Sequence, residues 1–302
     1  MKICTNINAG SKRTATGRTI NEDGLKVIDI PDTNIKIIMM MDGATGLGRK
    51  YEIEPGMTPA EWYVKEMLKE LTNEFLDDPI ISLESAVENG IKILKNKIAQ
   101  YEQNNDIKLL KYEEPSAGIS IVRIDDKITE IYNLGDTTTI VGYKNGEIQK
   151  IKNPNEEKLK AYDKRVIEEM VIRAKITKRT VVETRDDNEI QMLLKQNREQ
   201  KNGGEAESYY VCGTDIEAVK HGIHYLFPNN KLKRVINITD GVEYNMLGED
   251  EVMLYNRLNV DKPEDIIKEI REVQEEDSLC NKYPRLKKSD DITFVVVDYD
   301  KE

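Results

Sequence analysis

Four short acidic segments, far apart in the chain, carry the residue types best suited to chemistry. They are Asn21-Glu22-Asp23-Gly24, Met41-Asp42-Gly43, Thr239-Asp240-Gly241 and Ser289-Asp290-Asp291-Ile292-Thr293. Three of them adjoin apolar, β-branched-rich runs at 37–41, 235–238 and 292–297, which predict buried strands. Carboxylates at strand ends can meet at one edge of a sheet, where they repel one another unless a cation lies between them. The segments therefore predict a metal site built from oxygen ligands.

Asp42 and Asp240 are the strongest single candidates, because each ends a nearly all-apolar run. A glycine follows each of them, which lets the backbone approach a ligand closely. A lone Asp-Gly is also a common turn dipeptide, so neither position is decisive by itself. Hard oxygen ligands without a His or Cys cluster favour Mg²⁺ or Mn²⁺ over zinc.

Other reactive residue types offer weaker alternatives. His221 and His224 are the only two histidines and lie three residues apart on an expected helix, so a metal pair competes there with an ordinary surface or core role. Cys212 lacks a plausible histidine partner for nucleophilic catalysis. We expect Trp62, on the first predicted helix, to serve packing.

Bulk composition limits the classes of function. The chain has 302 residues and a formal net charge of −11, which argues against a nucleic-acid or anionic-membrane partner. No apolar stretch approaches the ~20 residues of a transmembrane helix, and the N-terminus lacks the apolar core of a signal peptide. Three scattered cysteines indicate no disulfide framework. We therefore expect a cytoplasmic protein.

The elements that must position the acidic segments follow from hydrophobic periodicity. Thr58-Pro59-Ala60-Glu61 combines a capping box with proline at the first helical position, which predicts a helix start. Helices are expected at 58–76 and 82–101, from 214 and from 263, and strands at 2–8, 35–41, 117–124, 128–134, 137–143, 147–151, 234–239 and 292–298. The 117–151 strands read as an antiparallel meander, and the whole as a layered α+β fold.

Residues 152–207 interrupt this pattern. They are rich in Lys, Glu, Arg and Asn, and carry a Gly203-Gly204 pair near their end. Such a segment is typical of a solvated charged insertion, and the alternative is a mobile flap beside an active site. No linker divides the chain, so we expect one domain over 1–302 with a flap-like insertion at about 152–207.

The order of the motifs resembles the PP2C (PPM) family of metal-dependent protein phosphatases, especially its bacterial serine/threonine members. The resemblance covers residues 18–298, and each motif alone is short. The matching segments are Arg18-Thr19-Ile20-Asn21-Glu22-Asp23, Met41-Asp42-Gly43-Ala44-Thr45-Gly46, Pro115-Ser116-Ala117-Gly118, Asn133-Leu134-Gly135-Asp136, Thr239-Asp240-Gly241 and Ser289-Asp290-Asp291-Ile292-Thr293.

The resemblance implies an αββα sandwich of two antiparallel β-sheets flanked by helices, with a binuclear metal site at one edge. Carried over by position, Asp42 would bridge both metal ions and Gly43 would supply a backbone carbonyl. Asp23 would hold one ion largely through water, and Asp240 and Asp290 would complete the other site.

Two further positions have implied roles. Asp136 matches a position associated with a third, weaker metal ion in bacterial members. Arg18 would bind the substrate phosphate, and a planar guanidinium suits two phosphate oxygens better than a lysine does.

The implied activity is hydrolysis of phosphoserine and phosphothreonine in proteins with two Mn²⁺ or Mg²⁺ ions. Water between the ions would attack phosphorus directly, so no protein nucleophile is needed. The partners would be phosphoprotein substrates, and the enzyme would oppose a serine/threonine kinase. We expect a monomer.

Several departures from the family pattern motivate an alternative, a catalytically silent module that uses the same fold to bind a partner. Ala44 replaces a residue that is often His or Met, so it supplies no general acid, and Thr45 replaces a glycine. Thr137-Thr138 lacks the arginine common after Asp136. Asp291 stands where Asn is usual, so Asp290 and Asp291 could exchange roles; we favour Asp290 as the ligand.

Overall fold

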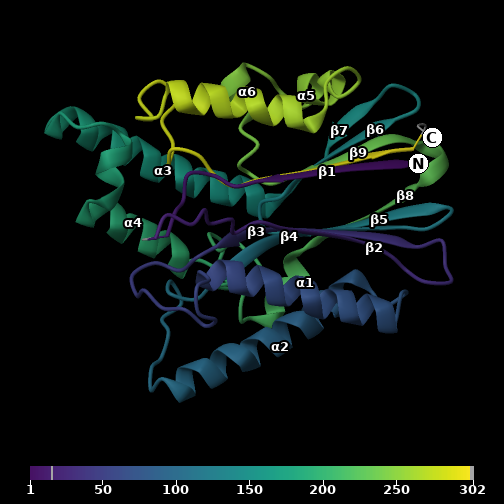
Figure 1. The fold of residues 1–302 in the computed structure, drawn as a ribbon, viewed down its shortest axis with the longest axis horizontal. Coiled ribbons are helices and arrows are strands. Elements are labelled where there is room, and N and C mark those ends of the chain that lie inside the picture. The colour runs from purple at the N-terminus through teal and green to yellow at the C-terminus, as the bar shows by residue number, and fades with distance from the viewer. Residues whose placement is uncertain (15, 300–302) are drawn as a thin grey trace.

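The computed structural model describes residues 1–14 and 16–299, which form two antiparallel five-stranded sheets (Figure 1). One sheet has the strand order β1-β10-β9-β6-β7, and the other β2-β3-β4-β5-β8. The strands are β1 (Lys2–Asn8), β2 (Gly24–Asp29), β3 (Lys36–Ala44), β4 (Ser116–Ile124), β5 (Ile128–Leu134), β6 (Thr138–Tyr143), β7 (Ile148–Lys150), β8 (Ile223–Pro228), β9 (Leu232–Ile238) and β10 (Ile292–Asp298).

Helices cover the outer face of each sheet, and a further pair lies beyond the strand ends (Figure 1). Helices α1 and α2 lie against the β2–β8 sheet, α5 and α6 against the β1–β7 sheet, and α3 and α4 at one end of the sandwich. Their bounds are α1 (Pro59–Asp77), α2 (Leu83–Asn104), α3 (Pro154–Thr177), α4 (Asn188–Glu199), α5 (Glu251–Arg257) and α6 (Pro263–Glu276). Along 1–14 and 16–299, no helix combines the length and apolar character needed to cross a membrane.

Side-chain alternation along the strands produces three apolar layers. In β3, Ile38 and Met40 face the space between the sheets, where they meet Val235 and Val295 of the other sheet. The intervening β3 residues pack instead against α1 and α2. On the opposite sheet, Phe294 of β10 packs under α5 and α6. Because both sheets are covered on both faces, central strands such as β3 and β10 are buried almost throughout and nearly continuous in apolar residues.

The strand directions bring the acidic segments to one end of the sandwich. Ile238, the last residue of β9, pairs with Phe294 near the start of β10, and Asp42 pairs with Gly118 near the start of β4. Strands β3 and β9 therefore end, and β4 and β10 begin, at the same edge. Helices α3 and α4 lie at that end, away from the two chain termini (Figure 1).

The structure corrects three expectations about the elements. His221 ends a short 3₁₀ turn and His224 lies in β8, so the two histidines do not share a helix. The expected four-strand meander crosses between the sheets, because the chain turns at Gly135 (φ 104°) after β5 and enters the other sheet as β6. Strands β2 and β8 were not expected; both lie at sheet edges and are only partly buried, which hides their periodicity.

The 152–207 insertion is helical and has an apolar core of its own. Val166 and Met170 of α3 pack with Ile190 and Leu194 of α4, and the cluster also includes Cys280. Asn153 caps the start of helix α3, and its side chain accepts hydrogen bonds from the backbone amides of Asn155 and Glu156. The insertion is therefore anchored to the segment that precedes β10.

A substitution in the buried face of β10 should reduce stability far more than one at the exposed edge of the other sheet. Phe294→Ala, at a fully buried side chain, is expected to lower the free energy of unfolding by about 3–5 kcal/mol because it removes apolar contacts and leaves a cavity. Leu226→Ala, on the exposed edge strand β8, should change it by less than about 0.5 kcal/mol. Urea denaturation of both variants checks this, and equal effects would contradict the layer assignment.

Candidate functional site

Four predicted ligands from distant parts of the chain line one cavity of about 340 Å³. Asp42 lies in β3, Asp136 follows β5, Asp240 follows β9, and Asp290 precedes β10. Gly43, the predicted carbonyl ligand, lines the same cavity. The sandwich therefore brings these five sequence-predicted residues together at the edge where the strands end.

Glycine allows the acidic segments to approach one another closely. A Cβ atom on Gly43 would lie 2.2 Å from the Glu22 carbonyl oxygen, and one on Gly241 would lie 1.9 Å from the Asp291 carbonyl oxygen. Any larger residue at either position would push the backbones apart. The glycines after Asp42 and Asp240 are thus required by the packing of the site itself.

Asp23 is held just behind the cavity wall. Its Oδ2 accepts hydrogen bonds from the Thr239 and Thr293 hydroxyls, at 3.0 and 2.8 Å, at the adjoining ends of β9 and β10. Burial, together with the nearby charges of Asp290 and Asp291, outweighs these hydrogen bonds and raises the pKa of Asp23 to about 8. Asp23 does not line the cavity, but its charge raises the pKa of Asp42.

The neighbouring residues Asp290 and Asp291 have different contacts. Asp291 is buried, and its two oxygens accept from the backbone amides of Gly10 and Glu22, each at 2.7 Å. Asp290 lines the cavity and forms an ion pair with Lys287. Because Asp291 is occupied in joining two chain segments, the contacts favour Asp290 as the ligand.

Loss of hydration and mutual repulsion together raise the pKa values of the carboxylates in the cavity. Loss of hydration raises the pKa of Asp42 well above its ordinary value, and the charges of Asp240 and Asp23 raise it further. The pKa of Asp240 is raised in the same way, by loss of hydration and then by the charge of Asp290. Because Asp240 is exposed to the cavity, the repulsion contributes more to this shift than it does at Asp42. Lys287 offsets part of this charge, and its own pKa is raised by Asp290 and Asp240 although burial opposes this.

The donor set fits a hard divalent cation in its chemistry. All the candidate side-chain donors in the cavity are carboxylate oxygens, which Mg²⁺ and Mn²⁺ prefer. Over 1–14 and 16–299, no three Asp, Glu, His or Cys side chains are grouped closely enough to surround one ion as they stand. Carboxylates that repel one another at this edge would be drawn together by a divalent cation.

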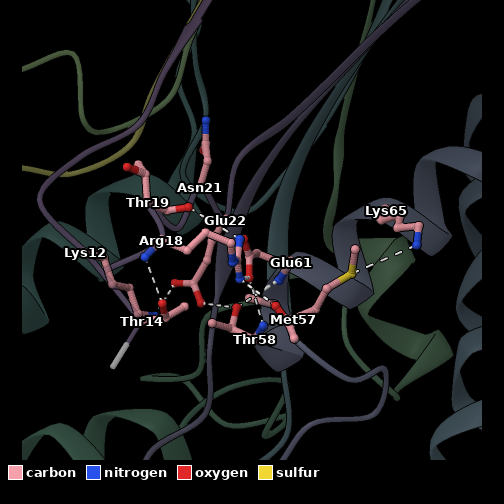
Figure 2. Close-up of polar contacts among 12 residues, drawn as sticks. Lys12, Thr14, Arg18, Thr19, Asn21, Glu22, Met57, Thr58, Glu61 and Lys65 are labelled. Atoms are coloured by element: carbon pink, nitrogen blue, oxygen red, sulfur yellow. Dashed lines mark hydrogen bonds and ion pairs between the residues drawn. The ribbon is translucent and has the colours of Figure 1, made fainter. Parts of the chain in front are cut away.

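Arg18, the predicted phosphate ligand, does not line the cavity. Its two terminal nitrogens donate to the two Glu61 oxygens at 2.8 and 2.9 Å, and Nη2 also donates to the Gly56 carbonyl at 2.7 Å (Figure 2). Glu61 in turn accepts from the Thr58 amide in the capping box of α1. In this arrangement Arg18 holds the start of α1, and its phosphate-binding role stays a prediction.

Sequence reasoning missed several residues that line the cavity. Glu22 accepts from the Thr45 and Thr58 hydroxyls and from Lys12, which joins the first acidic segment to the start of α1 (Figure 2). Its position beside Asp23 was the available signal. Asp163 on α3 and Arg198 on α4 reach the cavity from the insertion, where no motif marks them. Burial and the charge of Asp136 raise the pKa of Asp163 to about 6.

No protein-family model and no curated protein matches this sequence. Solved structures match over nearly its whole length. A bacterial serine phosphatase is 18% identical with a TM-score of 0.55, over 100% of this chain and 99% of its own. The fold is that of a bacterial serine/threonine phosphatase. The αββα sandwich expected from the PP2C resemblance is therefore confirmed.

Two further structures support the same fold. Serine/threonine phosphatase Stp1 from Staphylococcus aureus is 17% identical with a TM-score of 0.51, over 99% of this chain and 94% of its own. The catalytic domain of serine/threonine protein phosphatase PstP, in complex with two manganese ions, is 14% identical with a TM-score of 0.51, over 98% and 97%.

The contacts of Asp290 and Asp291 predict opposite behaviour of their amide variants. Asp291→Asn removes one of two charge-assisted acceptors for backbone amides, so it should lower the free energy of unfolding in EDTA by about 1–3 kcal/mol. Asp290→Asn should have a smaller effect on stability but reduce the rise in melting temperature that Mn²⁺ produces. Thermal melts with and without Mn²⁺ measure both, and a lost Mn²⁺ response in Asp291→Asn alone would reverse the assignment.

Stability in EDTA should fall as pH rises from about 5 to about 7. The folded-state pKa of Asp23 is raised to about 8 from an ordinary value of 3.8, so the folded protein binds more protons than the unfolded chain across this window. The contribution of the protonated Asp23 carboxyl to the free energy of unfolding is fully present below its ordinary pKa. It is lost as pH rises through its folded-state pKa. Asp23→Asn should flatten the dependence of the urea midpoint on pH; an unchanged slope in this variant would contradict the assigned cause.

Proposed function

We propose that this protein is a phosphoprotein phosphatase that uses two Mn²⁺ or Mg²⁺ ions to hydrolyse phosphoserine and phosphothreonine. One observation carries the proposal: Asp42, Asp136, Asp240 and Asp290 meet in one cavity at the strand ends of a fold shared with serine/threonine phosphatases. A cavity lined by so many carboxylates is suited to binding cations, and bound cations would in turn attract the oxygens of a phosphate ester.

The cation ligands follow from the cavity lining and the order of the motifs. Asp42 would bridge two ions, with the Gly43 carbonyl beside it. Asp240 and Asp290 would complete one site, Asp23 would act through water from behind the wall, and Asp136 would hold a third, weaker ion. Bound ions would lower the pKa of water between them and offset the charge that develops at phosphorus.

The chain's own groups orient this set. Thr239 and Thr293 fix one oxygen of Asp23, and Lys287 pairs with Asp290 and keeps the side chain at the cavity. Ala44 lines the cavity and has no proton to give to a leaving group. The role proposed for this wall of the cavity is therefore to hold cations rather than to transfer protons.

The substrate would be a phosphoserine or phosphothreonine side chain of another protein, and the enzyme would oppose a serine/threonine kinase. The cavity of about 340 Å³ has room for a phosphorylated side chain. The structural neighbours are named as serine and serine/threonine phosphatases, which supports this class of substrate.

A catalytically silent binding module is the second candidate. The observation that favours it is Arg18, whose guanidinium is engaged by Glu61 and lies outside the cavity. A silent module has no need to gather several carboxylates, which weighs against it. Calorimetric titration with Mn²⁺ separates the candidates, because absence of binding at millimolar metal would favour the silent module.

Hydrolysis of p-nitrophenyl phosphate and of a phosphothreonine peptide should require Mn²⁺ or Mg²⁺ and stop in EDTA. Asp240→Asn should reduce kcat/KM by at least about 100-fold, because it removes a charged ligand at the cavity. Asp77→Asn, at the exposed end of α1, is the matched control and should leave activity unchanged. Full activity in Asp240→Asn would refute the proposed function.

A further inference from the structure

A phosphate ester that enters this cavity meets an acidic wall and needs a cationic group opposite it. Asp42, Asp136, Asp240 and Asp290 would repel a phosphoryl dianion wherever bound cations do not fully offset their charge. A guanidinium provides several N–H donors in one plane and can bind two phosphate oxygens together. The cavity lining includes cationic side chains, and their existing partners show which of them can do this.

Arg18 and Lys12 are already committed. Three Arg18 hydrogen bonds go to Glu61 and Gly56, so a phosphate could be bound by its terminal nitrogens only if the anchor of the α1 capping box were broken (Figure 2). Lys12 forms an ion pair with Glu22, with a distance of 2.6 Å from Nζ to Oε2. Lys287 is paired with Asp290.

Two arginines of the cavity lining, Arg185 and Arg198, differ from these cations in that neither is paired with a carboxylate in the described part of the chain. The Nε of Arg185 is buried without a hydrogen-bond partner, whereas the guanidinium of Arg198 is oriented by a hydrogen bond. Arg198 lies in the last turn of α4 and lines the cavity, and its Nη1 donates to the Ser116 hydroxyl at 3.0 Å. One hydrogen bond to a neutral hydroxyl orients the guanidinium and leaves other N–H groups for an anion.

The contacts of Arg198 place it over the acidic wall. Ser116 is buried at the start of β4 and pairs in register with Ala44, two residues after Asp42. Asp136 and Asp163 line the same cavity as Arg198. The guanidinium is therefore within electrostatic reach of the carboxylates.

Helix α4 is held firmly enough to position this side chain. Ile190 and Leu194 pack in the apolar core of the insertion, and just after the helix the buried Lys201 donates to the Glu114 carbonyl at 3.3 Å. Glu114 lies two residues before Ser116, so both contacts bind the end of α4 to the same segment. A side chain held on a packed helix loses less entropy when it binds a ligand.

We propose that Arg198, and not Arg18, is the guanidinium that binds the phosphoryl oxygens of the substrate. This inference rests on the proposed phosphatase function. The charged insertion would then take part directly in substrate binding, because α4 supplies a cationic side chain to a cavity whose acidic residues come mostly from the sandwich.

The test uses inorganic phosphate as the probe and measures its affinity for the protein in two ways. Its inhibition constant against Mn²⁺-dependent hydrolysis of p-nitrophenyl phosphate is compared with its dissociation constant measured by calorimetry in Mg²⁺, which needs no turnover. Arg198→Ala should raise both constants roughly tenfold to hundredfold. Arg198→Lys keeps the charge but loses the planar fork, so it should raise them by a smaller factor of roughly threefold or more.

Two other arginine variants give the comparison its controls. Arg18→Ala should lower the melting temperature, since Glu61 loses its partner, yet change both constants by less than about twofold. Arg165→Ala removes a charge from an exposed position of α3 and should change neither. Unchanged constants in Arg198→Ala, or a rise in Arg18→Ala as large as in Arg198→Ala, would overturn the inference.

The two measurements also separate this inference from the proposed function. A wild-type protein that binds phosphate through Arg198 but hydrolyses no phosphate ester would support the Arg198 site and refute the phosphatase. A wild-type protein that hydrolyses the ester and binds phosphate equally well after Arg198→Ala would support the phosphatase and refute the site. If Arg198→Ala proves unstable in thermal melts, the constants of Arg198→Lys are used instead: a rise of roughly threefold or more would support the inference, and unchanged constants would overturn it.

Discussion

Repulsion among carboxylates at the edge of the sandwich is the constraint on which the rest of the site depends. Asp42, Asp136, Asp240 and Asp290 would separate in solution, and the fold holds them around one cavity. The apolar layers oppose this repulsion, because the segments that carry the carboxylates belong to, or directly adjoin, buried strands such as β3 and β10. The fold thus gathers the acidic segments at one edge, where a divalent cation would draw their side chains closer together.

The remaining acidic residues of the same segments serve to hold the segments together. Asp291 joins the backbone at Gly10 to that at Glu22, and Asp23 joins the ends of β9 and β10 through two threonine hydroxyls. Glu22 connects the first acidic segment to the start of α1. Within one acidic segment, one residue can therefore face the cavity while its neighbour forms the hydrogen bonds that hold the cavity wall in place.

The insertion completes the cavity from the side that the sheets leave open. Its two helices have an apolar core that also takes in Cys280, close to the segment that carries Lys287 and Asp290. The sandwich contributes most of the acidic groups, and the insertion contributes Arg185 and Arg198 together with Asp163, so cationic and acidic groups share the cavity. Such an arrangement suits a ligand that is itself an anion bound through cations.

Periodicity and residue type were enough to predict the buried strands and the helix that begins after Thr58, because each depends on neighbours within a few residues. Edge strands such as β8 escaped prediction, since their burial depends on a sheet assembled from elsewhere in the chain. The contacts of Asp291 with two backbone amides, the pairing of Arg18 with Glu61 and the approach of Arg198 to Ser116 were decided only by tertiary structure. Each depends on a partner tens to hundreds of residues away, and a side chain's availability for chemistry is set by the partner it has already found.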